Sequence, residues 1–163
     1  MTIPKADYSA LLQTLVRHKV AFIVVGGVSA VLHGVPITTL DLDIVHSLES
    51  DNLRRLISAL HELEVCYRGR GDQRLLPSAT TLASGSHHLL ITRFGPLDVL
   101  GTIGTGRGYE DLQEYTVELQ VHDFTVHVLS LEKLIEIKEE TGLDKDKAVL
   151  PILRRTLEEK MKR

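Results

Sequence analysis

The stretch that decides the fold runs from Phe22 to His46 and reads FIVVGGVSAVLHGVPITTLDLDIVH. Residues 21–25 are apolar and largely β-branched, which predicts a short buried strand. Two glycines end this run, residues 28–32 predict a short helix, and a turn through residues 33–36 follows. Residues 41–45 predict a second strand, so the order is strand, helix, strand.

Gly26 and Gly27 stand where the first predicted strand meets the helix. The start of a helix has free N–H groups and a partial positive charge, which attract phosphate oxygens. Glycine lets the backbone approach a polyphosphate without a clash from Cβ. The pair therefore indicates a phosphate site, although a plain turn between strand and helix would use two glycines as well.

Asp41 and Asp43 lie two positions apart in the second predicted strand. Side chains alternate along a strand, so the two carboxylates share one face while Leu42 and Ile44 point into the core. Aspartate is disfavoured in strands, and two neighbouring carboxylates repel unless a cation lies between them. The pair indicates a Mg²⁺ site, and the alternative is a polar edge strand that faces water.

Asp98 lies inside the short apolar run Pro96-Leu97-Asp98-Val99-Leu100. A carboxylate in such a strand is costly to bury unless it is paired or binds a metal. If this strand lies beside the Asp41 strand, three carboxylates converge as in a two-metal site for phosphoryl transfer. The alternative for Asp98 alone is a salt-bridged strand residue.

The rest of the chain predicts further helices and hairpins around these strands. Apolar spacing, turn residues and capping residues predict the following elements: a helix at 6–18, a helix capped by Ser50, a strand at 65–67, a long loop with at most one short strand at 69–86, a hairpin of 88–94 and 97–103 turning at Gly95-Pro96, a glycine-rich link at 101–108, a helical turn at 109–114, a hairpin of 116–121 and 124–129, a helix capped by Ser130 and ended by Gly142, and a last helix from 144 to 161 kinked or broken at Pro151.

This pattern predicts an α/β (α+β) fold with a mixed, twisted sheet and helices packed mainly on one face. We expect one domain over residues 1–163, with a catalytic core at about 20–130 and C-terminal helices at about 130–161.

The composition is that of an ordinary globular protein. The 163 residues include 43% hydrophobic and 25% charged residues, and a single cysteine, Cys66, which excludes an internal disulfide. A formal net charge of −3 argues against tight, sequence-independent nucleic-acid binding. The N-terminus lacks the order of a signal peptide and no apolar run approaches a membrane span, so we expect a cytoplasmic protein.

The ordered residues resemble a known superfamily. The order of Gly26-Gly27, then Asp41-x-Asp43, then a lone strand carboxylate at Asp98 resembles the DNA polymerase β-like nucleotidyltransferases. More narrowly, it is similar to small bacterial members related to the minimal nucleotidyltransferases and the AbiEii-type toxins. The run from Leu131 to Asp146 also resembles the helices that follow the sheet in these proteins, so the resemblance covers about residues 20–150.

The resemblance implies transfer of a nucleoside monophosphate from an NTP to a hydroxyl, with release of pyrophosphate. It implies that Gly26 and Gly27 hold the triphosphate, and that Asp41, Asp43 and Asp98 bind two Mg²⁺ ions, with Mn²⁺ as an alternative. The acceptor stays open between a small molecule, a tRNA end and a protein. Partners left open are an antitoxin and a second copy of the chain.

Two other functions also stay open. The chain is alternatively a non-catalytic member that binds nucleotide or a partner, for instance as the toxin component of a toxin–antitoxin pair. A metal phosphohydrolase would use the same carboxylates with water as the attacking group. The geometry of the three carboxylates bears on all of these functions, because a distant Asp98 would disfavour catalysis.

One position departs from the family pattern. Many relatives carry a basic residue shortly before the aspartate pair, where this chain has Ile37. The corresponding triphosphate contact is therefore either missing or supplied from elsewhere. Arg68, Arg70 and Arg74 in the long loop are candidates to supply it, as is Arg93. The alternative for these arginines is a solvated cluster on a loop.

Two further residues are candidate nucleotide contacts. His33 follows the short helix and is placed to reach a phosphate or the acceptor hydroxyl, unless it only ends the helix. Lys138 follows the apolar face of a C-terminal helix and is placed to face the cleft, unless it is a solvated helix lysine.

Overall fold

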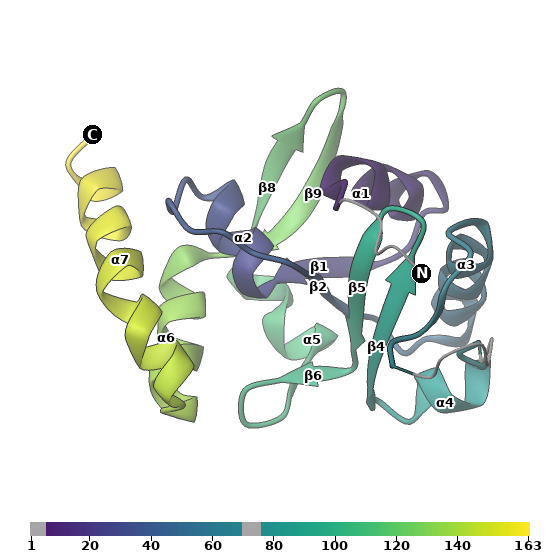
Figure 1. Ribbon diagram of the computed structural model, residues 1–163. Helices are drawn as coiled ribbons and strands as arrows, with labels where there is room; N and C mark the ends of the chain where they lie inside the picture. Colours follow the sequence, from purple (N-terminus) through teal and green to yellow (C-terminus); the bar gives the residue numbers. More distant parts are fainter. Residues whose placement is uncertain (1–5, 70–75) are drawn as a thin grey trace.

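The computed structural model describes residues 6–69 and 76–163 (Figure 1). Its helices are α1 (Tyr8–Arg17), α2 (Gly26–Leu32), α3 (Ser50–Glu62), α4 (Ala79–Ala83), α5 (Tyr109–Leu112), the 3₁₀ helix η1 (Gln113–Tyr115), α6 (Leu131–Thr141) and α7 (Asp144–Met161). Its strands are β1 (Phe22–Val25), β2 (Leu42–His46), β3 (Cys66–Tyr67), β4 (His87–Thr92), β5 (Gly95–Leu100), β6 (Thr102–Ile103), β7 (Arg107–Gly108), β8 (Thr116–Val121) and β9 (Phe124–Leu129).

Seven of these strands form one mixed sheet in the order β3-β4-β5-β2-β1-β9-β8. The β2–β5 and β1–β9 pairs are parallel, and the other neighbours are antiparallel. Strands β6 and β7 pair separately as a small ribbon. The α/β class with a mixed sheet that the sequence predicts is therefore confirmed.

Helices cover both faces of the sheet, a more even division than the sequence indicated (Figure 1). Because side chains alternate along β1, Phe22 and Val24 join one core while Ile23 and Val25 join the other. The first core is completed by α1, α3 and α4. The second core is completed by α5, α6 and α7, and α6 and α7 lie side by side at one end of the molecule (Figure 1).

Capping residues set the ends of two helices that frame the site. The Asp7 carboxylate accepts a hydrogen bond from the backbone N–H of Ala10 at 3.0 Å, at the start of α1. Ser130 caps α6 in the same way, through the N–H of Lys133 at 3.2 Å. Gly142 ends α6 with φ of 61°, the left-handed conformation that the sequence predicts there.

Several local predictions were wrong. The hairpin of β4 and β5 turns at Arg93-Phe94, and Gly95 already belongs to β5, because the hydroxyl of Thr92 closes the turn by donating to the Gly95 carbonyl at 2.8 Å. The helix α3 includes Ser50 as its first residue, with Glu49 in the cap position.

Other corrections concern loops and the last helix. The described part of the predicted loop at 69–86 contains a helix, α4, which Ser78 caps, in place of a short strand. The glycine-rich link contains the β6–β7 ribbon. The helix α7 continues through Pro151, which is exposed.

Candidate active site

Three carboxylates meet on one face of the parallel β2–β5 pair. Asp43 and Asp98 are direct neighbours in the register of the two strands, and Asp41 stands immediately before β2. Each of the three offers one carboxylate oxygen, and these oxygens all lie within 4.8 Å of one another. The strand residues between them, such as Leu42 and Leu97, are fully buried on the opposite face. The alternation that the sequence predicts around Asp41 and Asp43 therefore holds.

The cluster is electrostatically costly when no cation is bound. The pKa of Asp43 is raised to about 8, by burial first and then by the nearby carboxylates of Asp98 and Asp41, while Lys138 acts in the opposite direction. The pKa of Asp41 is also raised, by burial first and then by Asp98, and Arg68 opposes this shift. Neighbouring carboxylates at this separation favour either a retained proton or a bound cation.

The donor set fits a divalent metal. The Oδ1 atom of Asp43 is buried and has no hydrogen-bond partner among the residues that the structure describes. An ionised, buried oxygen without a donor is unfavourable unless a cation satisfies it. Three hard carboxylate oxygens suit Mg²⁺ or Mn²⁺, which bind few protein ligands and complete their shells with water and phosphate. Asp41, Asp43 and Asp98 are therefore the residues that would hold such ions.

The two glycines bring the start of α2 against this cluster. Gly26 has φ of +67°, and a Cβ atom there would overlap Oδ2 of Asp43 and lie 3.1 Å from its Cγ. A Cβ atom at Gly27 would lie 2.8 Å from Cβ of Thr39, in the segment that leads into β2. The glycine pair is therefore required by space, and it places the first N–H groups of α2 beside the carboxylates.

Arg68 contacts two of the carboxylates directly. Its Nη2 donates to Oδ1 of Asp98 at 2.7 Å and to the carbonyl of Leu90 at 3.1 Å, and its Nη1 lies 3.7 Å from Oδ2 of Asp41. Its side chain is one-third exposed, and it follows β3, which is an edge strand of the sheet. Of the other predicted arginines, Arg70 and Arg74 lie outside the described residues.

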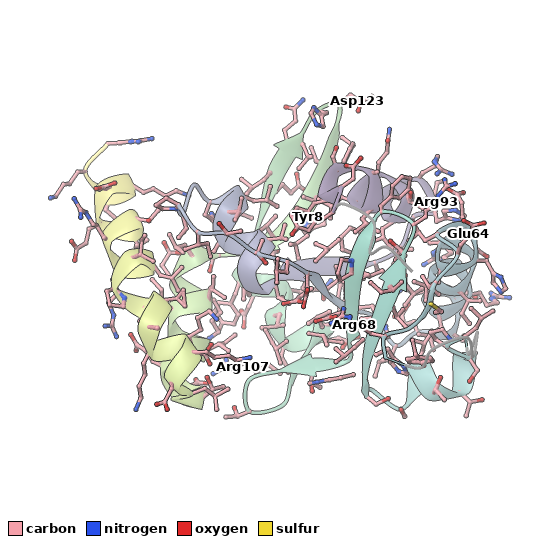
Figure 2. The ribbon with its side chains drawn as sticks, in the orientation of Figure 1. Tyr8, Glu64, Arg68, Arg93, Arg107 and Asp123 are labelled. Carbon is pink, nitrogen blue, oxygen red and sulfur yellow. The ribbon has the colours of Figure 1, made fainter. Side chains whose placement is uncertain are left out.

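Arg93 does not share this arrangement. Its guanidinium lies 4.8 Å from the centre of the Phe94 ring, at the turn between β4 and β5 (Figure 2).

Lys138 is held near the cluster by a polar network at the junction of α6 and α7. Its Nζ donates to Oδ1 of Asp146 at 2.9 Å, and Thr141 donates to Oδ2 of the same residue at 2.8 Å. Lys138 also lies close enough to Asp43 to favour the ionised form of that carboxyl. The lysine is therefore not a freely solvated helix residue, and it adds positive potential beside the carboxylates.

His33 makes contacts other than those that the sequence suggested. Its Nε2 donates to the carbonyl of Leu129 at 2.8 Å, and its Nδ1 accepts from Nζ of Lys160 at 3.1 Å. Burial lowers the pKa of this imidazole, which is consistent with a neutral ring. These contacts join α2 to β9 and α7, and a phosphate contact by His33 stays a prediction.

Tyr8 was missed as a site residue by the sequence analysis. Its hydroxyl donates to the backbone carbonyl of Thr39, just before the aspartate pair. Burial raises the pKa of Tyr8, and Asp41 and Asp43 raise it further, so the phenol lies within electrostatic reach of both. Its position in the helical apolar spacing indicated only a core residue, and nothing local in the sequence pointed to this contact.

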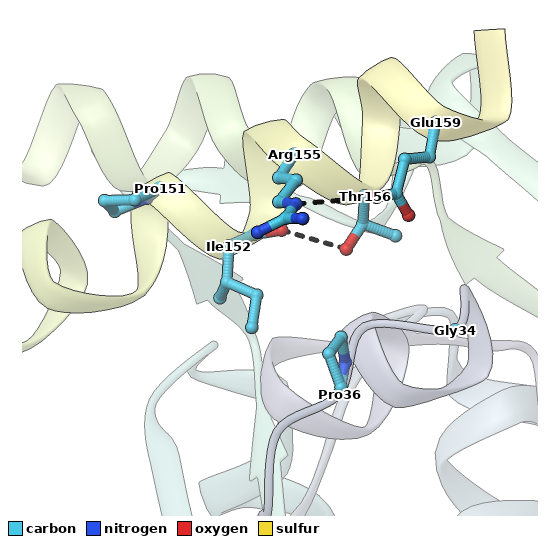
Figure 3. A pocket seen from close by; sticks show the side chains of 7 residues that line it. All are labelled: Gly34, Pro36, Pro151, Ile152, Arg155, Thr156 and Glu159. Atoms are coloured by element: carbon cyan, nitrogen blue, oxygen red, sulfur yellow. Dashed lines mark hydrogen bonds and ion pairs between the residues drawn. The ribbon is translucent and has the colours of Figure 1, made fainter. Parts of the chain in front are cut away.

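A separate groove lies between α7 and the loop that follows α2. It has a volume of about 470 Å³ and is lined by Gly34, Pro36, Pro151, Ile152, Arg155, Thr156 and Glu159 (Figure 3). Its polar groups satisfy one another in part, since Arg155 pairs with Glu159 at 3.5 Å and Thr156 donates to the Ile152 carbonyl. None of the three carboxylates lines it, so it is a different place from the candidate site.

The architecture is that of a nucleotidyltransferase fold. A solved structure from Thermotoga maritima, provisionally assigned as a nucleotidyltransferase, is 22% identical with a TM-score of 0.56, and the match covers 93% of each chain. The lincosamide antibiotic adenylyltransferase LnuA, solved with lincomycin bound, is 13% identical with a TM-score of 0.60, and the match covers 93% of this chain and 98% of that one. Likeness at these identities establishes the fold alone.

Neither protein-family models nor curated proteins match the chain. Among the residues that the structure describes, no helix has the length and apolar character needed to cross a membrane.

Proposed function

We propose that this protein is a metal-dependent nucleotidyltransferase that moves a nucleoside monophosphate from an NTP to a hydroxyl acceptor. The observation that carries the proposal is the convergence of Asp41, Asp43 and Asp98 within 4.8 Å, beside the start of α2. A nucleotidyltransferase fold with this donor set at the junction of two parallel strands supports phosphoryl transfer over other metal chemistry.

In the proposed reaction, the acceptor oxygen forms a bond to the α-phosphorus, and the bond from that phosphorus to the oxygen bridging to the β-phosphate breaks. Two bound Mg²⁺ ions would supply Lewis-acid activation and neutralise charge on the leaving pyrophosphate. Asp41 and Asp43 would hold both ions. Asp98 would complete one ion site and accept the proton of the acceptor hydroxyl.

The positively charged groups around the carboxylates would bind the triphosphate of the NTP. Gly26 and Gly27 bring the free N–H groups of α2 close to Asp43 and would face the β- and γ-phosphates. Arg68 would exchange its contact with Asp98 for a phosphate contact, and Lys138 would add a second cation. These two side chains would replace the basic residue that this chain lacks at Ile37.

The test combines ion binding with label transfer. Wild-type protein is titrated with Mn²⁺ by electron paramagnetic resonance, with and without each NTP, and the titration is repeated with Asp41→Asn and Asp98→Asn. Asp123→Asn, at the exposed tip of the β8–β9 hairpin (Figure 2), is the matched control because it removes a carboxylate outside the cluster. We expect strong loss of Mn²⁺ binding in the first two variants and none in the control.

Label transfer then separates the possible reactions. Each α-labelled NTP is incubated with Mg²⁺ and with lincomycin, total tRNA or the protein itself as the acceptor. Labelled product with pyrophosphate release supports the proposal. Free labelled monophosphate without any adduct would indicate hydrolysis instead, and NTP binding without turnover for any acceptor class would favour a non-catalytic nucleotide-binding domain. Metal-independent, equal NTP binding by wild type and Asp41→Asn would overturn the proposal.

A further inference from the structure

The three carboxylates are not held equally well by the sheet. Asp43 and Asp98 lie inside the β2–β5 ladder, where backbone hydrogen bonds fix their positions. The ladder begins at the Leu42–Leu97 pair, so Asp41 precedes it and has no strand partner. The position of Asp41 therefore depends on contacts made by the segment that leads into β2.

Thr39 makes those contacts. Its hydroxyl donates to the Asp41 carbonyl at 3.3 Å, and its side chain lies against Gly27, where a Cβ atom would come within 2.8 Å of it. Its own carbonyl accepts the hydroxyl of Tyr8, a residue 31 positions away in the chain. Tyr8 thus ties the segment that carries Asp41 to α1.

The residues around Tyr8 are also fixed to the strand that carries Asp98. The backbone N–H of Asp7 donates to the Phe94 carbonyl at 2.8 Å, at the turn before β5. Ala6 packs against Gly95 so closely that a Cβ atom at this glycine would lie 2.9 Å from Cα of Ala6. Residues 6–8 therefore contact both chain segments that present the carboxylates. These contacts fix the segment before β2 relative to the start of β5.

From this geometry we infer that Tyr8 is a positioning residue of the metal site, whose hydroxyl fixes Asp41 relative to Asp43 and Asp98 through the Thr39 carbonyl. The inference rests on the proposed function, because it concerns ions that the three carboxylates would hold. The Tyr8 proton is engaged by a backbone carbonyl, so Tyr8 acts through Asp41 and not on the substrate.

Tyr8→Phe is the decisive variant, because it keeps the ring that packs into the core and removes only the hydroxyl. We expect its Mn²⁺ affinity to fall by about tenfold, the scale of one hydrogen bond, with little change in melting temperature. Tyr115→Phe is the matched control. It also deletes one phenolic hydroxyl, but the ring of Tyr115 carries Lys133 over its face at 3.9 Å and is part of another contact. Its Mn²⁺ affinity should equal that of the wild type.

A double-mutant cycle distinguishes positioning from a general structural role. In an Asp41→Asn background, Tyr8→Phe should have no further effect on the remaining Mn²⁺ affinity, because the group that it positions is no longer a ligand. If Tyr8→Phe lowered Mn²⁺ affinity only by destabilising the fold, the same decrease in affinity would also occur in the Asp41→Asn background. Thr39→Val, which removes the hydroxyl bond to Asp41 and keeps the carbonyl that Tyr8 contacts, should weaken Mn²⁺ binding in the same direction.

The outcomes separate this inference from the proposed function. If wild-type protein binds Mn²⁺ through the carboxylates and Tyr8→Phe binds it equally well, the positioning inference is overturned and the proposed function stands. The inference is also overturned if the losses from Tyr8→Phe and Asp41→Asn simply add. If the wild type binds no Mn²⁺, the proposed function fails, and the inference fails with it.

Discussion

A Cβ atom at Gly26 would overlap the Oδ2 atom of Asp43, so the first residue of α2 has no room for a side chain beside the central carboxylate of the site. The contact is made possible by two properties of one glycine, its positive φ of +67° and its missing side chain. The start of α2 and the carboxylate cluster are therefore one unit, and the glycine pair is as much a part of the ion site as of any phosphate site.

Gly26→Ala should therefore displace the Asp43 carboxylate. We expect a fall of Mn²⁺ affinity by tenfold or more and a loss of about 1–3 kcal/mol in the free energy of unfolding, from the strained φ and the overlap. Gly34→Ala is the control, because Gly34 also has a positive φ (+90°) but nothing lies within 4 Å of its Cβ position. The control should lose stability and keep its Mn²⁺ affinity. Equal ion binding by the two variants would contradict the role given to Gly26.

Arg68→Gln tests whether this arginine competes with the ions. In the absence of nucleotide, the guanidinium is bonded to Asp98 and lies near Asp41, so its removal should raise Mn²⁺ affinity about threefold to tenfold. The same variant should weaken binding of the Mn²⁺–NTP complex, since a phosphate contact is lost. Titrations with and without NTP measure both effects, and Arg93→Gln serves as a charge-matched control. Weaker Mn²⁺ binding without nucleotide would refute the competition.

The raised pKa of Asp43 predicts a pH dependence of stability in metal-free protein. The ordinary value for the carboxyl is 3.8, and it is about 8 in the folded chain. Below about pH 4 the group is protonated in both states. Between about pH 4 and 8 the unfolded chain releases the proton and the folded chain keeps it, so the contribution of Asp43 to stability is lost progressively as pH rises.

Urea unfolding in a chelator at several pH values measures this loss. Relative to Asp43→Asn, which cannot ionise, wild type should become less stable from pH 5 to pH 8. Added Mn²⁺ should restore more stability at pH 8 than at pH 6, because ion binding must release fewer protons there. A difference between the two proteins that does not change with pH would contradict the assignment.

Asn52 is the polar anchor of the core that carries the site. Its side chain is buried, accepts from the Ala21 N–H at 2.6 Å, and donates to the carbonyls of Ala21 and Ser47. Asn52→Ala would leave these buried groups without partners, so we expect a loss of about 2–4 kcal/mol in the free energy of unfolding. Gln120→Ala, which removes an exposed amide bonded to the His122 carbonyl, should cost within about 0.5 kcal/mol. A loss below 1 kcal/mol for Asn52→Ala would show that the anchor is dispensable.

Local patterns in the sequence predicted the strands and helices that surround the site. The hairpin of β8 and β9 occurs at the predicted residues, because alternation and the His122-Asp123 turn specify it locally, and His122 adopts a positive φ of 54° there. Strand alternation also predicted the shared face of Asp41 and Asp43, although Asp41 stands one residue before β2. The proximity of Asp98 to this pair was predicted only on the condition that the strand of Asp98 lies beside the strand of Asp43. The β2–β5 register confirms that condition.

Contacts between distant segments could not be predicted by the same means. Tyr8 meets Thr39 and Arg68 meets Asp98 at separations of 31 and 30 residues, and each contact depends on how the helix or loop is placed on the sheet. The turn at Arg93-Phe94 was misplaced because Gly95-Pro96 is a frequent turn pair, while here Gly95 is needed in β5 for the close approach of Ala6.

The parallel pairing of β2 with β5 has a kinetic consequence. Residues 43 and 98 are distant in the chain, and parallel strands close only after the intervening segment has crossed over. A fragment that ends before β5 lacks Asp98 and therefore cannot assemble the three carboxylates. The time course of Mn²⁺ binding during refolding would therefore measure the rate at which β2 and β5 pair, separately from the formation of the helices.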